Sequence, residues 1–203
     1  MIKTSLAAEF LFDTMDSGVV AFSSILQAGF KVNVHTGVSI KDLLCNQFDI
    51  DPDYVEDRIH TAFLNGKPVD DFSTAIIESG ATLALSAAMP GLVGATFRKG
   101  GYLAAFRGTI THRRADTVAL DRTDVMFVKL FNLLAKEIGA TFLKGGVMVD
   151  SDTARWFFSD PPDAFRRNCK DILVGGQHVK ADQLSQRIAS GSEAFVALQL
   201  MTS

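Results

Sequence analysis

Residues 61–69 read TAFLNGKPV, and residues 171–179 read DILVGGQHV. In each stretch, four residues with strand character precede a two-residue turn, Asn65-Gly66 in the first and Gly175-Gly176 in the second. Asn-Gly is the strongest short-range signal for a β-hairpin, because both central residues of the tight turn need a positive φ. We therefore expect a strand and a tight turn in each half of the chain.

The same offset, 176 − 66 = 110 positions, relates residues outside the two turns. The further pairs are Gly29 with Gly139, Pro52-Asp53 with Pro162-Asp163, Val69 with Val179 and, after one inserted residue, Ser79-Gly80 with Ser190-Gly191. We interpret the chain as an α+β protein with mixed or antiparallel sheets, built from two pseudo-repeated β-α-β-turn-β units at about residues 29–90 and 139–203. They would form a single compact domain or two tightly packed halves. The alternative is that glycine turns in unrelated α+β chains look alike.

A second echo relates GATFRKGG at residues 94–101 to GATFLKGG at residues 139–146, with seven of eight positions identical. Its offset is 45 positions, so it cannot record the same duplication as the first echo. We interpret each copy as a strand that enters a Lys-Gly-Gly turn, where glycine supplies the positive φ. This predicts strands at Gly94–Phe97 and Ala140–Leu143. A Gly-rich hairpin and a basic stretch would lie over 91–120 between the two repeats, and the second strand of this hairpin would be Tyr102–Ile110.

The longest helix is predicted over Asp121–Ile138. Its apolar positions follow the helical period; they are Val125, Val128, Phe131, Leu134 and Ile138. Gly139 would end the helix. The last predicted strand, Glu193–Leu200, carries one charge at its start and none after it. Such a strand must lie inside a sheet or be covered by a partner, and we therefore expect a homodimer.

Composition narrows the class of protein. The chain has 203 residues, of which 47% are hydrophobic and 21% charged, and a net charge of −3. These values indicate a globular protein and give no global attraction to nucleic acid. No run of about 18 apolar residues is present, so no membrane span is expected. Cys45 and Cys169 form no CxxC motif, so we predict unpaired, mostly buried cysteines and a cytoplasmic protein, with one disulfide between them as the alternative. The four histidines have no metal-ligand spacing, and no metal or cofactor is predicted.

The segment from Val34 to Pro90 resembles the small sulfur-carrier β-grasp proteins, of the molybdopterin-synthase small-subunit and thiamine-biosynthesis type. The residues that carry the resemblance are GVSIKDLL at 37–44, FLNGKPV at 63–69 and SGATLAL at 79–85. The resemblance implies a β-grasp-like topology. Sulfur carriers end in a free Gly-Gly, whereas this sequence ends in Met201-Thr202-Ser203 and its Gly100-Gly101 pair is internal. The carrier chemistry is therefore not implied, and fold alone does not assign function.

Candidate binding residues gather around the Lys-Gly-Gly turns and the basic stretch 98–122. Backbone N–H groups in such turns can hold an anion, and neighbouring lysine and arginine residues add charge. The candidates for ligand binding are Arg98, Lys99, Gly100, Gly101, Arg107, Arg113 and Lys144. The alternatives are ordinary hairpin turns and a basic stretch that is a solvated strand face or pairs with the acidic residues of the first half of the chain. The sequence lacks GxxxxGK[ST] and GxSxG motifs, so it is no P-loop protein and shows no nucleophile elbow.

Two functions stay open at this point. The first is a non-catalytic binding or assembly protein, whose partners would be a second copy, an anionic small molecule or another protein. The second is a small enzyme or sensor that binds an anionic small molecule near the Lys-Gly-Gly turns and residues 98–122. No catalytic residue can be named from the sequence. A concave site lined by Arg98, Arg107, Arg113 or Lys144 would favour the second function.

Overall fold

The computed structural model describes residues 6–87, 91–102, 107, 111–112 and 122–202. The chain forms two compact units. The first unit comprises Asn33–Leu134, and the second comprises Ile2–Val32 together with Ala135–Ser203. In sequence, the first unit is thus inserted between two segments of the second, and each is described by itself.

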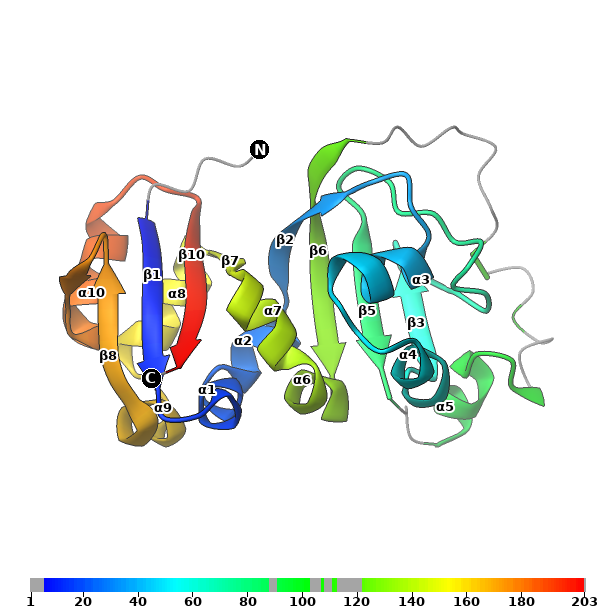
Figure 1. Cartoon of the computed structure of the whole chain (residues 1–203), viewed down its shortest axis with the longest axis horizontal. Helices are drawn as coiled ribbons and strands as arrows, with labels where there is room; N and C mark the ends of the chain where they lie inside the picture. Colours follow the sequence, from blue (N-terminus) through cyan, green and yellow to red (C-terminus); the bar gives the residue numbers. More distant parts are fainter. Residues whose placement is uncertain (1–5, 88–90, 103–106, 108–110, 113–121, 203) are drawn as a thin grey trace. The chain divides into compact units, whose positions relative to one another are not determined.

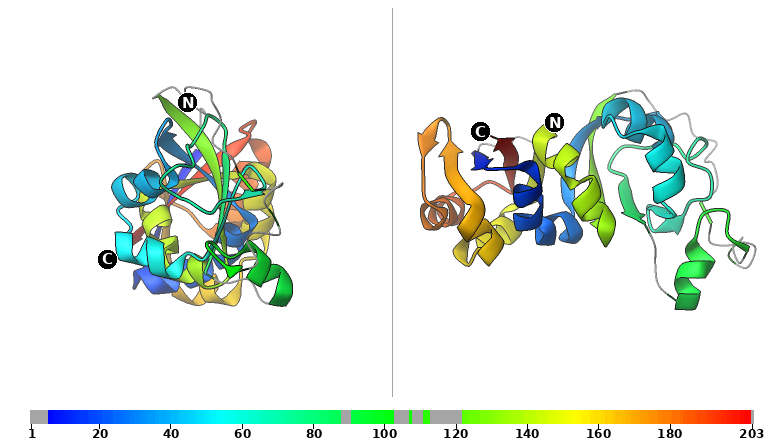
Figure 2. Two further views of the ribbon diagram at one scale, coloured as in Figure 1. Left: turned by 90° about the vertical axis from the view of Figure 1, so that its right-hand side faces the viewer. Right: turned by 60° about the horizontal axis from the view of Figure 1, so that its bottom comes forward.

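The first unit is a mixed sheet with helices on one face (Figures 1 and 2). Its strands follow the order β4-β3-β5-β6-β2. Strand β3 pairs antiparallel with β4 and β5, and β5 pairs parallel with β6. The elements are β2 (Phe30–His35, which begins in the second unit), α3 (Ile40–Asp42), η1 (Leu43–Gln47), α4 (Pro52–Arg58), β3 (Thr61–Leu64), β4 (Lys67–Pro68), β5 (Thr82–Ser86), α5 (Gly91–Phe97) and β6 (Thr123–Phe131).

Local sequence signals explain several of these boundaries. The Ser39 hydroxyl accepts a hydrogen bond from the Asp42 N–H and caps α3, and the Asp51 carboxylate accepts from two N–H groups at the start of α4. Both residues are strong N-caps. At the hairpin between β3 and β4, Asn65 and Gly66 have φ values of 51° and 77°. The Asn-Gly turn is therefore as the sequence predicts.

The second unit is a sheet in the order β7-β10-β1-β8-β9. Strands β1 and β10 pair parallel, whereas β8 and β7 flank them antiparallel. Helices α8 and α10 lie on one face of the sheet (Figure 1). The elements are β1 (Leu6–Phe12), α1 (Met15–Ala21), α2 (Ser23–Ala28), α7 (Gly139–Gly145), β7 (Val147–Asp150), α8 (Ser151–Ser159), α9 (Asp163–Asn168), β8 (Cys169–Val174), β9 (Gln177–His178), α10 (Ala181–Ser190) and β10 (Phe195–Thr202); α6 (Leu133–Glu137) crosses the boundary between the units.

An aromatic cluster fills the core of the second unit. The ring of Phe165, from α9, has its centroid 5.7–5.9 Å from those of five other phenylalanines. These are Phe10, Phe12, Phe22, Phe157 and Phe158, which come from β1, the α1–α2 junction and α8. Most of the contacts are edge-to-face, an arrangement that favours the ring quadrupoles. The cluster fixes α9 and the start of β8 on the sheet.

The helix predicted over Asp121–Ile138 is wrong. Residues Thr123–Phe131 form strand β6, and Leu133–Glu137 form the short helix α6. The buried side chains Met126, Val128 and Leu130 alternate with less buried ones, which is the strand period rather than the helical one. Asn132, with φ of 54°, separates the two elements.

The strands predicted for the two GATF segments are also wrong. Gly94–Phe97 lies in α5 and Ala140–Leu143 lies in α7, so both echoed segments are helical. Alanine favours helix, and in α7 the residues Phe142 and Leu143 are both buried. The first strand of the predicted Gly-rich hairpin is therefore part of helix α5 instead. Its second strand, at residues 102–110, lies mostly outside the described residues.

The homodimer was predicted because the last strand must lie inside a sheet or be covered by a partner. That strand is β10, which lies inside the sheet with β1 on one side and β7 on the other. Its backbone therefore offers no open edge, and the homodimer stays a prediction without this support. In the part of the chain that the structure describes, no helix has the length and apolar character needed to cross a membrane.

Candidate functional site

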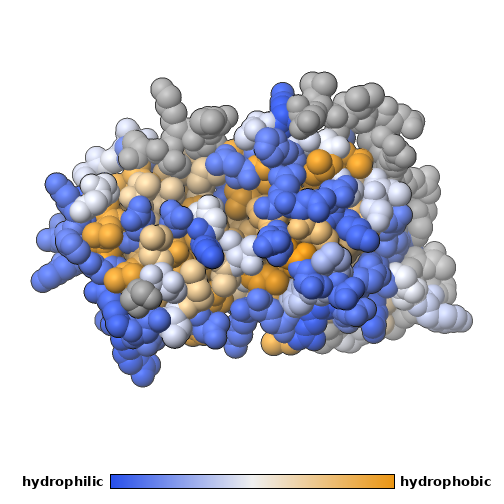
Figure 3. All heavy atoms as spheres, in the orientation of Figure 1, coloured by the Kyte–Doolittle hydropathy of each residue, from blue (hydrophilic) through white to orange (hydrophobic). Residues whose placement is uncertain are grey.

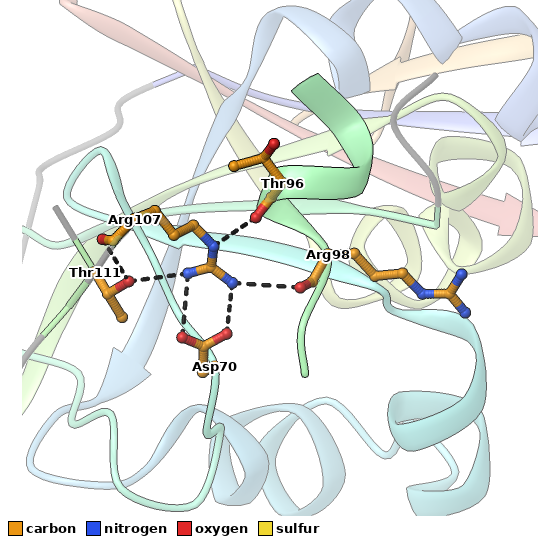
Figure 4. A network of polar contacts seen from close by, with 5 residues as sticks. All are labelled: Asp70, Thr96, Arg98, Arg107 and Thr111. Carbon is orange, nitrogen blue, oxygen red and sulfur yellow. Dashed lines mark hydrogen bonds and ion pairs between the residues drawn. The ribbon is translucent and has the colours of Figure 1, made fainter. Parts of the chain in front are cut away.

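Arg107 lies at the centre of a polar network in the first unit (Figure 4). Its two terminal nitrogens, Nη1 and Nη2, donate to the Asp70 carboxylate at 3.1 and 2.5 Å. The remaining donors bond to the Thr96 carbonyl at 2.7 Å, the Thr111 hydroxyl at 3.0 Å and the Arg98 carbonyl at 3.3 Å. A guanidinium has five N–H groups, and all five are used here. The side chain is only 1% exposed, so its bonds join three segments of the unit rather than face a ligand.

Lys99 is likewise held by protein groups. Its amino group lies 3.2 Å from a Glu56 carboxylate oxygen and 3.2 Å from the Glu56 carbonyl. It also sits 4.6 Å from the centroid of the Phe72 ring. The backbone N–H of Lys99 donates to the His60 carbonyl at 2.7 Å. Side chain and backbone of the predicted turn lysine therefore both have partners within the first unit.

The other sequence-predicted site residues that the structure describes belong to both units. Arg98 and Gly100 lie beside Lys99 with Gly100 exposed, and Gly101 is half-buried. Lys144 is exposed near the end of α7, in the second unit. Arg113 lies outside the described residues. The predicted site combined residues that belong to two units, because the GATF echo relates segments from both.

A cleft of 280 Å³ in the first unit includes Lys99 and Gly100 in its wall. The charged residues around it are two lysines and three acids: Lys41, Lys99, Glu56, Asp70 and Asp71. Acids outnumber bases, and Asp70 and Glu56 already pair with Arg107 and Lys99. This cleft does not offer the positive field that an anion would need.

A larger cleft, of 570 Å³, lies in the second unit between α9, β8, β9 and the start of α10. Phe165, Ile172 and Val179 form its apolar wall. Around them stand Arg166, Lys170, Asp171, His178 and Lys180, together with Pro161, Cys169, Ala181 and Gln183. The space-filling view shows apolar side chains between hydrophilic ones over the region of β8 and α9 (Figure 3).

Cations outnumber acids on this cleft. Arg166 pairs with Asp160, and Lys170 pairs with Asp13. Both pairs are solvent-exposed, with all four side chains at least half exposed. An exposed ion pair contributes only about 0–1 kcal/mol, so a ligand anion can replace the acid at little cost. Lys180 has no ion pair with the described residues.

Three residues of the cleft are of the types found in Cys-His-Asp catalytic sets. His178 Nδ1 lies 2.5 Å from the Asp171 carboxylate, but the Cys169 thiol donates to the Asp171 carbonyl at 3.4 Å. The thiol therefore bonds to the main chain rather than to the imidazole. Burial raises the pKa of Cys169 to about 12, and the nearby Asp171 charge adds to this rise. A thiol with that pKa stays protonated near neutral pH and is a poor nucleophile.

The described residues contain no candidate metal site. No group of three or more His, Cys, Asp or Glu side chains there could hold a metal ion. Cys45 and Cys169 are both unpaired and half-buried, so the prediction of free thiols is confirmed, although they are less buried than expected.

The cleft of the second unit was not predicted from the sequence. Its basic residues are spread over positions 166–180 among apolar ones, and only the tertiary fold brings α9, β8 and α10 together. The basic stretch 98–122 is denser in sequence and is therefore the stronger signal before folding is considered. One sequence feature does point to the cleft: the basic residues Arg166, Arg167 and Lys170 lie just before the hairpin at residues 171–179.

The chain matches no protein-family model, and neither the curated proteins nor the solved structures include one similar enough to it to count as a relative. The geometry of the two units is therefore the basis for any functional conclusion.

Proposed function

We propose that this protein is a binding or assembly protein that recognises an anionic ligand in the cleft of the second unit. The observation that carries the proposal is the lining of that cleft. Three cationic side chains, Arg166, Lys170 and Lys180, stand around an apolar wall, and the one acid, Asp171, lies against His178. A ligand with negative charge and an apolar portion complements this arrangement.

Electrostatics favour this cleft over the one that the sequence indicated. The first unit's cleft has three acids and two lysines, whereas the second unit's cleft has three permanent cations and one acid. Neither of these two clefts is lined by Arg98, Arg107 or Lys144. These two clefts therefore give no support to an anion site lined by Arg98, Arg107 or Lys144.

The chemistry of the lining supports recognition rather than catalysis. The Cys169 thiol stays protonated at neutral pH because its pKa is about 12. His178 is directed to Asp171, and its side chain is 75% exposed. The lining thus provides charged groups, hydrogen-bond donors and apolar surface. Cys169, His178 and Asp171 do not form a nucleophile next to a base.

The test measures binding of 1-naphthyl phosphate, an anion with an apolar ring, to the full chain by isothermal titration calorimetry. Competition by inorganic pyrophosphate then reports the charged part of the site alone. We expect binding that weakens between 0.15 M and 1 M salt, because the Debye length falls from about 8 Å to about 3 Å. The double variant Arg166→Gln/Lys180→Gln should weaken binding by at least about tenfold, since each hydrogen bond to a charged group contributes roughly 1.5–3 kcal/mol.

The matched control is Arg98→Gln/Lys144→Gln, which removes two cations from the sequence-predicted site. It should leave the affinity unchanged. If this control loses binding and the cleft variant keeps it, the ligand sits at the Lys-Gly-Gly turns and the proposal is wrong. The proposal also fails if neither 1-naphthyl phosphate nor pyrophosphate binds.

We also propose that the first unit is β-grasp-like, in line with the resemblance to sulfur carriers. The order β2, α3, β3, tight turn, β4 and β5 supports this proposal.

The matching hairpins β3–β4 and β8–β9, each at a sheet edge, support the pseudo-repeat. The strand after each hairpin differs, since β5 pairs with β3 whereas β10 is separated from β8 by β1.

A further inference from the structure

Strand β8 is only partly paired along its outer edge. Its neighbour β9 has two residues, which pair with Leu173 and Val174. The Val179 N–H extends the pairing by one bond, to the Ile172 carbonyl at 2.9 Å. Beyond this point the chain turns into α10, which begins at Ala181. The first half of β8, Cys169–Asp171, therefore has no strand beside it on this edge among the described residues.

On its other edge β8 pairs with β1, and Lys170 has no partner residue in that pairing. The register between β1 and β8 shifts between Leu11 and Phe12: Leu11 faces Asp171, and Phe12 faces Cys169. Lys170 is the extra residue of this β-bulge and faces no residue of β1. Bulges occur at sheet edges and beside binding sites, where they redirect a side chain and interrupt pairing. The Cys169 N–H donates to the Phe165 carbonyl, and the Asp171 carbonyl accepts from the Cys169 thiol. The main chain of Lys170 is therefore the part of this stretch that an incoming strand would meet.

This open stretch of backbone lies in the same cleft that carries the cations. Cys169, Lys170 and Asp171 line this cleft together with Lys180 and Ala181. The edge of the first unit differs, because its strand β4 contains Pro68 and the Pro68 carbonyl accepts the His112 N–H at 2.8 Å. Proline and a covering segment are two common ways to block an edge. Strand β8 itself contains no proline.

We propose that an extended acidic peptide segment of a partner protein binds in this cleft by adding a strand beside Lys170, with its acidic side chains on Arg166, Lys170 and Lys180. This inference rests on the proposed function and names its ligand class. In strand addition, main-chain hydrogen bonds supply the affinity and alternate side chains supply the specificity. Successive same-face side chains of a strand are about 7 Å apart, so a peptide with alternating acidic and apolar residues presents charge to the rim and apolar groups to Phe165 and Val179.

The probe is acetyl-Glu-Val-Glu-Val-Glu-Val-Glu-amide, titrated into the full chain with detection by isothermal calorimetry. Its control is the same peptide with alternate N-methylated residues, in two forms that block either edge. N-methylation keeps the charge and removes the N–H donors. Loss of two hydrogen bonds at about 1 kcal/mol each weakens binding by at least tenfold, and we expect this for one of the two N-methylated forms only. A Lys-for-Glu peptide should not bind.

Two protein variants complete the test. Lys180→Glu reverses one rim charge away from the bulge and should weaken the Glu-Val peptide by about tenfold or more, since it replaces an attraction by a repulsion. Lys144→Glu makes the same charge change outside the cleft and should leave the affinity unchanged. Hydrogen exchange of the Lys170 amide should slow when the peptide is bound, which a purely electrostatic contact would not produce.

The outcomes separate this inference from the proposed function. If both N-methylated peptides bind as tightly as the parent peptide, charge alone is recognised, so strand addition is wrong while the anion site stands. If 1-naphthyl phosphate binds and the peptide does not, the ligand is a small anion and strand addition is again wrong. If neither binds, both proposals fail. A dimer that Lys180→Glu dissociates would place a second copy in the cleft and would overturn the peptide as occupant.

Discussion

Replacing Arg107 by methionine tests whether this arginine holds the first unit together or serves a ligand. Methionine keeps an unbranched apolar side chain of similar length and removes all five donors. The substitution deletes two charged hydrogen bonds to Asp70 and three more, to the acceptors of Thr96, Arg98 and Thr111. Each of these acceptors would have to find water or another donor.

The magnitude follows from burial. Removing one partner of a buried ion pair costs roughly 3–5 kcal/mol, largely because the other charge is left without compensation. The Asp70 side chain is 37% exposed, so part of its carboxylate regains water and the cost falls. We expect a loss of about 2–3 kcal/mol in the free energy of unfolding, from the same principle discounted for exposure. For a chain of this size, each 1 kcal/mol lowers the Tm by roughly 2–4 °C.

Urea unfolding followed by far-ultraviolet circular dichroism measures the effect, with a double-mutant cycle through Asp70→Asn. The double variant should cost less than the sum of the single ones, because the two side chains interact directly. The matched control is Arg98→Met, which removes a neighbouring arginine from the same segment and should change stability by no more than about 0.5 kcal/mol. Equal stabilities of the Arg107→Met and Arg98→Met variants would refute the structural role.

Three further predictions concern other sites. Cys169 should react with 5,5′-dithiobis(2-nitrobenzoate) at pH 8 far more slowly than in urea, because its thiol pKa is about 12; a Cys45→Ser variant isolates this slow thiol, and rapid native labelling would contradict the burial. The Ser79 hydroxyl, aided by the Val125 N–H and the Arg122 guanidinium, lowers the pKa of Asp124 to about 2. The stability that Asp124 contributes is therefore present above its ordinary value of 3.8 and is lost as the pH falls towards 2; the advantage of wild type over Asp124→Asn in urea should shrink over this range, and a constant difference would show that the carboxylate is not responsible. Phe165→Ala should lower the free energy of unfolding by about 3–5 kcal/mol, and Phe165→Leu by less; calorimetric melting of the two variants checks this order, and equal melting temperatures would show that the ring contacts do not matter.

Turn and cap chemistry made parts of the fold predictable. Asn65-Gly66 and Gly175-Gly176 act locally, because their positive φ values fix a tight turn whatever surrounds it. Ser39 and Asp51 likewise cap helices through their own side chains. These signals need no knowledge of the tertiary structure. The predicted α+β class is confirmed, and of the predicted mixed or antiparallel sheets the structure has the mixed form.

Segments whose structure depends on burial were not predictable in the same way. Residues Thr123–Phe131 fit a helical period and a strand period, and the parallel pairing with β5 decides for the strand. The GATF segments contain glycine and a β-branched threonine, yet both are helical. The cleft of the second unit is assembled from α9, β8 and α10, so its basic rim could be seen only once these elements were placed by the phenylalanine cluster.

The position of β1 has a consequence for biosynthesis. This strand leaves the ribosome well before both strands that pair with it, because β8 and β10 lie far downstream in the sequence. At about 5–20 residues per second, roughly 10–40 s pass before β10 follows. The first unit is contiguous in sequence and can fold during this delay, while β1 still lacks the strands with which it pairs. Nascent chains of this protein should therefore engage a chaperone at β1 until β8 and β10 have been synthesised.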